Sequence, residues 1–238
     1  KDIYESTNWN ADLKWEYFPS NGELVSATVF GKLIQNPINS IFINSTSNDI
    51  SYINSGDAAE VFGLEVELKK DLYNFNGNDA EFDHTISGGL NVSLIKTAQD
   101  LNAEKVNAET DYSASFTFDS SKLTGASDVL VNTDLTYFKA FDENRSIQTT
   151  VAYNYFSDQL NTIGTLKKGN VIDKSFHTLD LIVKSKFNKL NISISAKNLL
   201  NPSIQRIQEV YETPGISEVT LNEFKRGVNI NLSVGYKF

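Results

Sequence analysis

The sequence contains no cysteine and no methionine among its 238 residues. Without cysteine the chain can hold no disulfide, no thiolate nucleophile and no cysteine-ligated metal ion. Methionine is missing even at position 1, and residues 1–5 lack the apolar core that a signal peptide requires. We therefore expect the chain to be a processed or partial piece of a longer polypeptide.

Long hydrophobic runs are also missing. Hydrophobic residues make up 40% of the chain, but no stretch approaches the ~18 to 20 consecutive apolar residues that a membrane-spanning helix needs. A helical membrane protein is therefore excluded. A membrane β-barrel is not excluded, because its strands need an apolar side chain only at every second position.

Basic residues are outnumbered by acidic ones, with 21 lysines and arginines against 30 aspartates and glutamates and a formal net charge of -9. A protein that binds nucleic acid would carry a basic surface, so nucleic acid is not an expected partner. The acidic residues are expected mainly on solvated loops.

What the sequence does contain is alternation of apolar and polar residues, which is clearest in segment 227–238. There every even-numbered residue from Val228 to Phe238 is apolar or aromatic, and every odd-numbered residue is polar, charged or glycine. A period of two predicts a strand with one apolar and one polar face. The apolar face would cover a core in a soluble sandwich and contact lipid in a membrane barrel, so this strand alone leaves both open.

The same alternation recurs along the chain and predicts about nine strands. The alternation is clearest at residues 12–17, 25–29, 64–69, 89–94, 131–137, 147–155, 178–187, 190–197 and 228–238. Each strand is expected to be near the ~9 to 11 residues of a tilted membrane strand, several with an extension beyond it, and helical periodicity is essentially missing. The predicted fold class is all-β, an antiparallel transmembrane β-barrel.

The connections between these strands alternate in length. Short turns are predicted near residues 19–22, 141–145 and 187–189, with a somewhat longer one near 73–82. Long polar segments are predicted near residues 36–57, 98–127, 162–175 and 209–222. This arrangement is typical of outer-membrane barrels, in which the short turns are periplasmic and the long loops extracellular.

The two faces of the strands predict what each side chain contacts. Residues expected to face lipid are Leu179, Leu181, Leu190, Ile192, Val228, Ile230, Leu232 and Val234. Residues expected to face the lumen are Glu65, Glu67, Asp134, Asp180, Lys184, Asn191, Asn229 and Asn231. A soluble sandwich with a solvated outer face could show a similar pattern, and it stays open as the alternative fold.

Aromatic residues favour the barrel. Tyr17, Phe18, Phe187, Tyr236 and Phe238 fall at strand ends beside predicted short turns, where a membrane barrel carries an aromatic girdle. The apolar face that ends in Tyr236 and Phe238 also resembles the C-terminal signal read by the outer-membrane assembly machinery.

Several short segments, taken together in their order along the chain, resemble a known protein family. They are Asp12–Pro19 followed by Gly22–Leu24, then Asn36–Ile38, Gly63–Leu68, Leu123–Ser127 leading into Asn132–Tyr137, Asn198–Pro202, and the terminal Phe238. In order and spacing, across nearly the whole chain, they resemble the C-terminal part of TonB-dependent outer-membrane receptors, particularly those of the Bacteroidetes.

The resemblance implies a bacterial outer-membrane location and active nutrient import. Such receptors are single-chain barrels of 22 strands that enclose an N-terminal plug and use energy relayed by the TonB complex. This chain has no recognisable plug, TonB box or full set of strands, so residues 1–238 are expected to be the C-terminal segment of the barrel. The implied partners are outer-membrane lipid, the N-terminal strands and plug of the same protein, the TonB complex through that plug, and a surface lipoprotein.

Other functions remain open at this stage. A receptor-like barrel could act as a structural scaffold in an outer-membrane complex, and a small barrel could be a porin or an enzyme. His84 and His177, the only histidines, are expected at opposite sides of the membrane, so a paired catalytic site is not indicated. No calcium-loop spacing is present among the loop carboxylates. We therefore predict no catalytic residue, no metal site and no cofactor.

Overall fold

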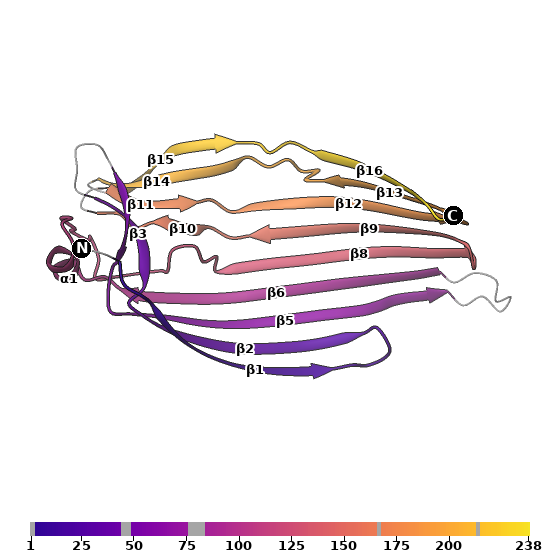
Figure 1. Cartoon of the computed structure of the whole chain (residues 1–238), viewed down its shortest axis with the longest axis horizontal. Coiled ribbons are helices and arrows are strands. Elements are labelled where there is room, and N and C mark those ends of the chain that lie inside the picture. Colours follow the sequence, from indigo (N-terminus) through magenta and orange to yellow (C-terminus); the bar gives the residue numbers. More distant parts are fainter. Residues whose placement is uncertain (1–2, 44–48, 76–83, 166–167, 213–214) are drawn as a thin grey trace.

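The computed structural model describes residues 3–43, 49–75, 84–165, 168–212 and 215–238. Within these residues a single antiparallel sheet joins nine long strands in the order β1-β2-β5-β6-β8-β9-β12-β13-β16 (Figure 1). The strands are β1 (Thr7–Tyr17), β2 (Leu24–Gln35), β5 (Ala58–Phe75), β6 (His84–Asp100), β8 (Val129–Asp142), β9 (Arg145–Phe156), β12 (Phe176–Phe187), β13 (Leu190–Lys197) and β16 (Asn229–Tyr236). The prediction of an all-β antiparallel fold with about nine strands is confirmed.

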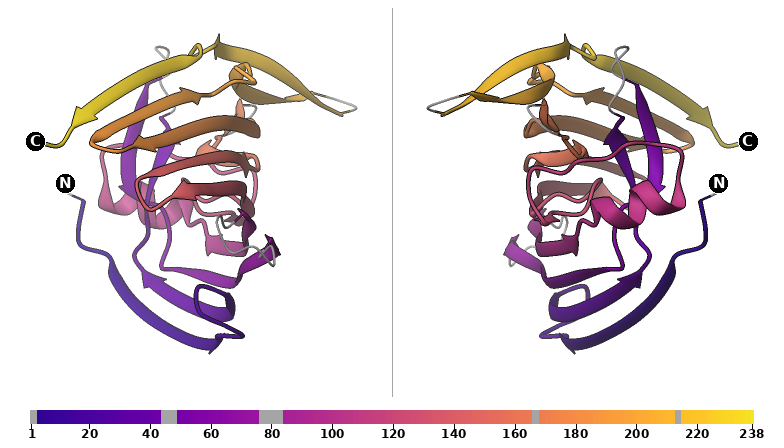
Figure 2. Two further views of the ribbon diagram at one scale, coloured as in Figure 1. Left: turned by 90° about the vertical axis from the view of Figure 1, so that its right-hand side faces the viewer. Right: turned by 90° about the vertical axis from the view of Figure 1, so that its left-hand side faces the viewer.

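The sheet is curved and open. Seen along its strands it forms an arc, with β1 at one edge and β16 at the other (Figure 2). In the described residues these two edge strands are not paired with each other, so the sheet does not close. No helix in the described ranges is long and apolar enough to cross a membrane.

Cross-strand register places most apolar residues of the nine strands on one face. One row of paired residues runs Tyr17, Val25, Leu68, Leu90, Thr133, Tyr153, Leu179, and another runs Val151, Leu181, Ala196, Ile230. A row on the other face runs Glu16, Ser26, Glu67, Asn91, Asn132, Asn154, Thr178. Alternation within each strand, combined with this register, therefore produces one mainly apolar and one mainly polar face, and the polar face also carries Phe30, Leu130 and Ile182.

The polar face is the concave one. Ser93, Thr97 and Gln99 belong to the polar face of β6 and are buried, and Gln99 bonds to Asn39 of the short strand β3 (Ile38–Phe42). Figure 2 shows β3 inside the arc. On the convex face Leu13 and Ile230 are 78% and 72% exposed. A soluble sandwich would bury that face under a second sheet, and in the described part of the chain none covers it.

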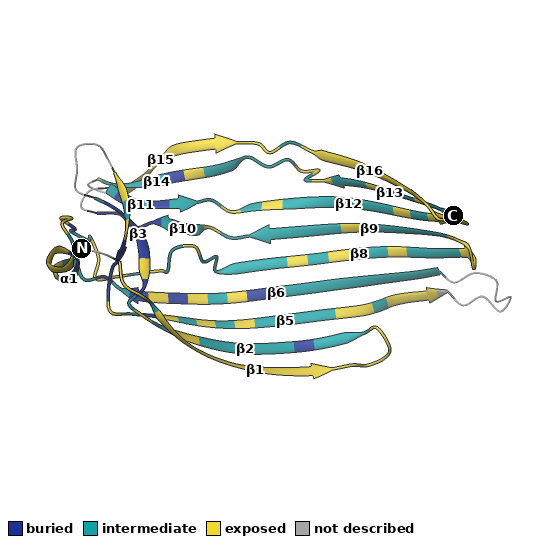
Figure 3. Cartoon of the chain, in the orientation of Figure 1, coloured by how far each residue is buried: buried dark blue, intermediate teal, exposed yellow. Residues whose placement is uncertain are grey.

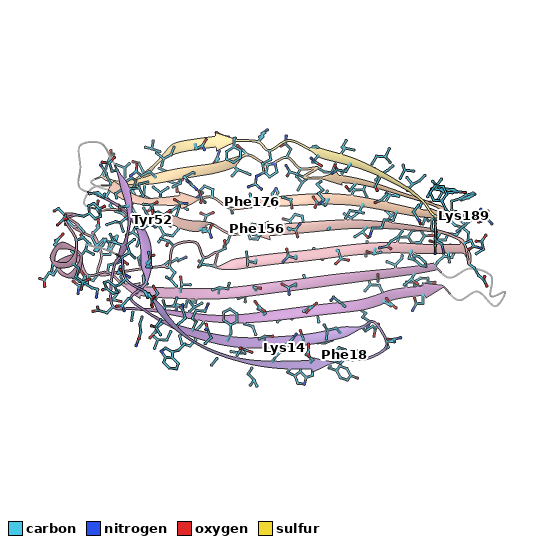
Figure 4. All side chains as sticks on the ribbon, viewed as in Figure 1. Lys14, Phe18, Tyr52, Phe156, Phe176 and Lys189 are labelled. Carbon is cyan, nitrogen blue, oxygen red and sulfur yellow. The ribbon has the colours of Figure 1, made fainter. Side chains whose placement is uncertain are left out.

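Short turns gather at one end of the sheet, the short-turn end. They join β1 to β2 through residues 18–23, β8 to β9 through 143–144, and β12 to β13 through 188–189. The turn predicted near 73–82 lies largely outside the described residues, since β5 reaches Phe75 and β6 begins at His84. Figure 4 shows Phe18 and Lys189 at strand ends. The aromatic residues predicted at these strand ends are present and exposed there: Tyr17, Phe18, Phe187, Tyr236 and Phe238.

The opposite, long-connection end carries more regular structure than the sequence predicts. Beyond β3 it contains β4 (Ile50–Asn54), α1 (Ala103–Glu109), β7 (Ser120–Ser121), β10 (Gln159–Thr162), β11 (Lys168–Asp173), β14 (Ile204–Glu212) and β15 (Gly215–Phe224). Strands β10-β11-β14-β15 form a second antiparallel sheet. The segment 209–222, predicted as a long polar loop, is therefore mostly a strand hairpin.

The hydrophobic core lies at this same end. Its buried members are Ile41, Ile53, Leu101, Val106, Ala114, Leu160 and Ile163, and Figure 3 shows the buried positions concentrated there. The helix α1 supplies Val106, and it begins after Asn102, whose side-chain oxygen accepts the Lys105 N–H at 2.9 Å. The core thus fixes the long connections against the concave face, while the strands beyond it stay single-layered.

Candidate functional site

The candidate site is the concave face, because the predicted lumen-facing residues lie on it. Cross-strand pairs connect Glu65 with Thr28 and Ser93, and Glu67 with Ser26 and Asn91. Further along the same face Asp134 of β8 and Asp180 of β12 both pair with Ala152 of β9. Lys184, Asn191, Asn229 and Asn231 continue this face on β12, β13 and β16.

A hollow of about 230 Å³ lies on this face around Gly89 of β6. Its polar lining includes Glu67, Asn91, Asn132, Asp134 and Asn154. Gly89 leaves room for the Asp134 carboxylate at the edge of the hollow, since a Cβ there would lie 2.4 Å from Asp134 Oδ1. The carboxylate of Asp134 therefore occupies space that any other residue at position 89 would fill.

Two ion pairs lie on this face, one on β5 at the hollow and one on β1. Lys69 Nζ lies 2.8 Å from Glu67 Oε1, and Lys14 Nζ lies 2.7 Å from Glu16 Oε1. Figure 4 labels Lys14 on β1. Because all four side chains are partly exposed, these pairs contribute little to stability.

The other predicted residues are not gathered at the hollow. Asp180 Oδ1 accepts the Asn198 N–H at 2.8 Å, so this carboxylate anchors the end of β13. Lys184 lies four residues further along β12, roughly 13 Å at the rise of an extended strand, and is exposed. Asn231 donates its side-chain amide to Asn229 on the same strand. The structure thus groups Glu67 and Asp134 and leaves the others dispersed along the face.

The two histidines lie at opposite ends of the strands. His84 starts β6 at the short-turn end, where its Nδ1 lies 2.8 Å from the Tyr137 hydroxyl. His177 is near the start of β12, which runs toward the short-turn end, and its ring lies 6.0 Å from that of Tyr153. The two imidazoles are thus not paired. Among the described residues no group of three His, Asp or Glu side chains could hold a metal ion.

A buried cluster of polar side chains beneath β3 was not predicted. Asn39 Nδ2 donates to Ser55 Oγ and to Gln99 Oε1, each at 2.7 Å, and Asn39 Oδ1 accepts the Thr124 hydroxyl at 2.8 Å. Gln99 Nε2 donates to the Lys122 carbonyl at 2.8 Å. We call Asn39, Ser55, Gln99 and Thr124 the amide clasp. It binds the β3–β4 hairpin to the concave wall. The sequence does carry one signal for it: if the alternation of β6 is continued beyond Leu94, Gln99 falls on the polar face of that strand.

Ion pairs lie in and beside the second sheet, whose strands are joined by backbone pairing. Arg206 makes two bonds to Asp173, from Nε at 2.6 Å and from a terminal nitrogen at 3.0 Å, and this pairing raises the pKa of the guanidinium. Burial would raise the pKa of the Asp158 carboxyl, but the bonds from Lys174 and from the Ser175 N–H outweigh it and keep that pKa below its ordinary value. These charges are satisfied within the fold, so they indicate no catalytic group.

Comparison with known proteins identifies the family. The model for "TonB dependent receptor-like, beta-barrel" matches residues 3–199. No curated protein and no solved structure matches the chain. The family match covers β1 to β13 and so includes the Gly89 hollow and the amide clasp. Proteins of this family are transporters and not enzymes, they reside in the outer membrane, and they act with a plug and with TonB. The chain belongs to the TonB-dependent receptor-like β-barrel family, and its function is transport at the bacterial outer membrane.

Proposed function

We propose that the chain forms part of the wall of an active importer that takes up a scarce nutrient with energy from the TonB complex. The observation that carries the proposal is the mainly polar concave face, which bears the hollow between Glu67 and Asp134 and belongs to a chain of the receptor family. A polar, hydrated lumen is what the interior of a transport barrel requires.

In this proposal the concave face lines the lumen and the convex face contacts lipid. The lumen-facing residues are Glu65, Glu67, Asp134, Asp180, Lys184, Asn191, Asn229 and Asn231. The short-turn end is periplasmic, and the long connections are extracellular and contact the substrate. The amide clasp supports this use of the loops, because it holds the β3–β4 hairpin on the lumen side of the wall.

The remaining wall comes from other strands of the same protein. The edges of β1 and β16 are unpaired in the described residues, and in hydrocarbon each unpaired backbone group costs several kcal/mol. We infer that residues 1–238 are the C-terminal segment of a 22-stranded barrel, completed by N-terminal strands and filled by a plug. A surface lipoprotein above the extracellular loops is a further proposed partner.

A nutrient-limited growth assay tests the proposal. One strain lacks the gene for the full-length protein, and a second carries it with the TonB box deleted. Both strains should lose growth on the same nutrient in a panel of scarce nutrients, since active import needs TonB coupling. Normal growth of the TonB-box strain beside a defect in the deletion strain would reject active import and favour a scaffold.

Deletion of Phe238 from the full-length protein should lower the amount assembled in the outer membrane without lowering synthesis. Phe238 is fully exposed and its ring packs edge-to-face on Tyr236 at 5.2 Å, so the assembly machinery can reach both rings. Heat-modifiable mobility of the barrel measures assembly, and pulse labelling measures synthesis. Phe187→Ala at the same end is the control and should assemble normally. An unchanged assembled level after Phe238 deletion would contradict the role of this residue.

A further inference from the structure

A groove of about 560 Å³ crosses the sheet beside the β1–β2 turn. Leu68, Leu72, Leu90, Leu135, Val151 and Tyr153 supply most of its apolar lining. Register assigns Leu68, Leu90, Leu135, Val151 and Tyr153 to the convex face. The volume lies within the roughly 300 to 1,000 Å³ of small-molecule sites. This hollow is therefore on the face opposite the Gly89 hollow.

Gly88 creates the groove. It pairs with Lys70 on one side and Leu135 on the other, so it lies in a row of large side chains and adds none of its own. A Cβ at this position would approach Leu72 Cδ1 to 3.3 Å. Leu72 sits in a register shift of β5 between Asp71 and Tyr73, and its side chain leans toward Gly88. The groove is therefore a property of this sequence and not of sheets in general.

Lys70 places one positive charge at the groove on the convex face. The groove is also lined by Lys69 and Asp134, but Lys69 is paired with Glu67 and Asp134 covers Gly89, which assigns both side chains to the concave face. Glu23 Oε1 accepts the Asp71 N–H at 3.3 Å and so bends toward the turn backbone. Lys70 is exposed and shows no ion pair among the described residues.

We propose that this groove binds one phospholipid, with an acyl chain along the apolar lining and the phosphate at the Lys70 ammonium. The outer-membrane location of the family brings lipid to the convex face. The charge of Lys70 complements the phosphate, and the apolar lining excludes a polar solute. With the short-turn end periplasmic, the phospholipid belongs to the periplasmic leaflet.

Native mass spectrometry of the purified full-length protein tests this proposal with two probes. The probes are palmitoyl-oleoyl phosphatidylglycerol and the diacylglycerol with the same two chains, which lacks the phosphate. Gly88→Leu fills the groove, and the contact it makes with Leu72 involves the end of a flexible side chain. Val151→Phe fills the groove from the neighbouring strand if Gly88→Leu fails to assemble. Ala196→Leu, on the same face but outside the groove, and Lys139→Gln, at the short-turn end, are the matched controls.

The proposal predicts a different pattern for each variant. Gly88→Leu should weaken binding of both probes about tenfold, the effect of losing roughly two methylene contacts. Lys70→Gln should weaken phosphatidylglycerol binding about fivefold and leave diacylglycerol binding unchanged, because only the phosphate contact is lost. Both controls should bind like the wild type. Equal binding of phosphatidylglycerol by the wild type, Gly88→Leu and Val151→Phe would contradict binding in the groove. An equal loss of binding of both probes in Lys70→Gln would contradict the contact between the phosphate and Lys70.

Discussion

Replacing Leu232 by arginine is expected to lower the free energy of unfolding of the full-length barrel by ~2 to 4 kcal/mol, the cost of a charged side chain facing the middle of the bilayer. Leu232 lies near the middle of β16, pairs with Ile194, and is 68% exposed on the convex face. The guanidinium would have to leave water for hydrocarbon there. Denaturant titration of the protein folded into lipid vesicles measures the loss.

Asn231→Arg provides the matched control for this substitution. Asn231 is the preceding residue of β16, pairs with Ser195, and belongs to the concave face. Its arginine would remain hydrated in the lumen, so the change in unfolding free energy should be under about 1 kcal/mol. Equal losses for the two variants would contradict the assignment of lipid and lumen faces.

The nine long strands could be predicted from the sequence because alternation is a local property. The polar residues on either side of Val228, Ile230, Leu232 and Val234 show that these four share one face. No knowledge of the partner strand is needed for this. The same holds for the short turns, where Asn188 adopts a φ of 56° that asparagine tolerates. Sequence therefore predicts the wall of the barrel well.

The long-connection end could not be predicted in the same way. In β3 the residues Asn39, Ser40, Ile41 and Phe42 are all buried, so both faces are covered and the period of two disappears. The helix α1 has seven residues, too few to establish a period of 3.6. In β15 the apolar residues Ile216, Val219, Leu221 and Phe224 are spaced by three, two and three residues, so the segment shows no period of two.

The candidate site was predicted only in part, because register decides which residues meet. Glu67 and Asp134 were predicted to face the lumen, but their common hollow depends on the alignment of β5, β6 and β8 around Gly89. The groove at Gly88 needs the same alignment and the register shift at Leu72. Residues far apart in sequence define both features, and alternation carries no information about that alignment.

Replacing Asn39 by leucine is expected to lower the free energy of local opening of the β3–β4 hairpin by about 3 kcal/mol, because each buried polar group left without a partner costs roughly 1 to 3 kcal/mol. Asn39 is 1% exposed and bonds to Ser55, Gln99 and Thr124. Its loss leaves the Gln99 side-chain oxygen without the donor that now binds it. Hydrogen exchange of amides in β3 and β4 should accelerate, while exchange in β12 and β13 stays unchanged.

Adding Gln99→Leu to Asn39→Leu should lower the free energy of opening much less than Gln99→Leu does in the wild type, because the two residues share their bonds. Asn191→Leu, an exposed position on β13, is the control and should leave exchange unaltered. Unchanged exchange in β3 after Asn39→Leu would show that the hydrophobic core alone holds the hairpin on the wall.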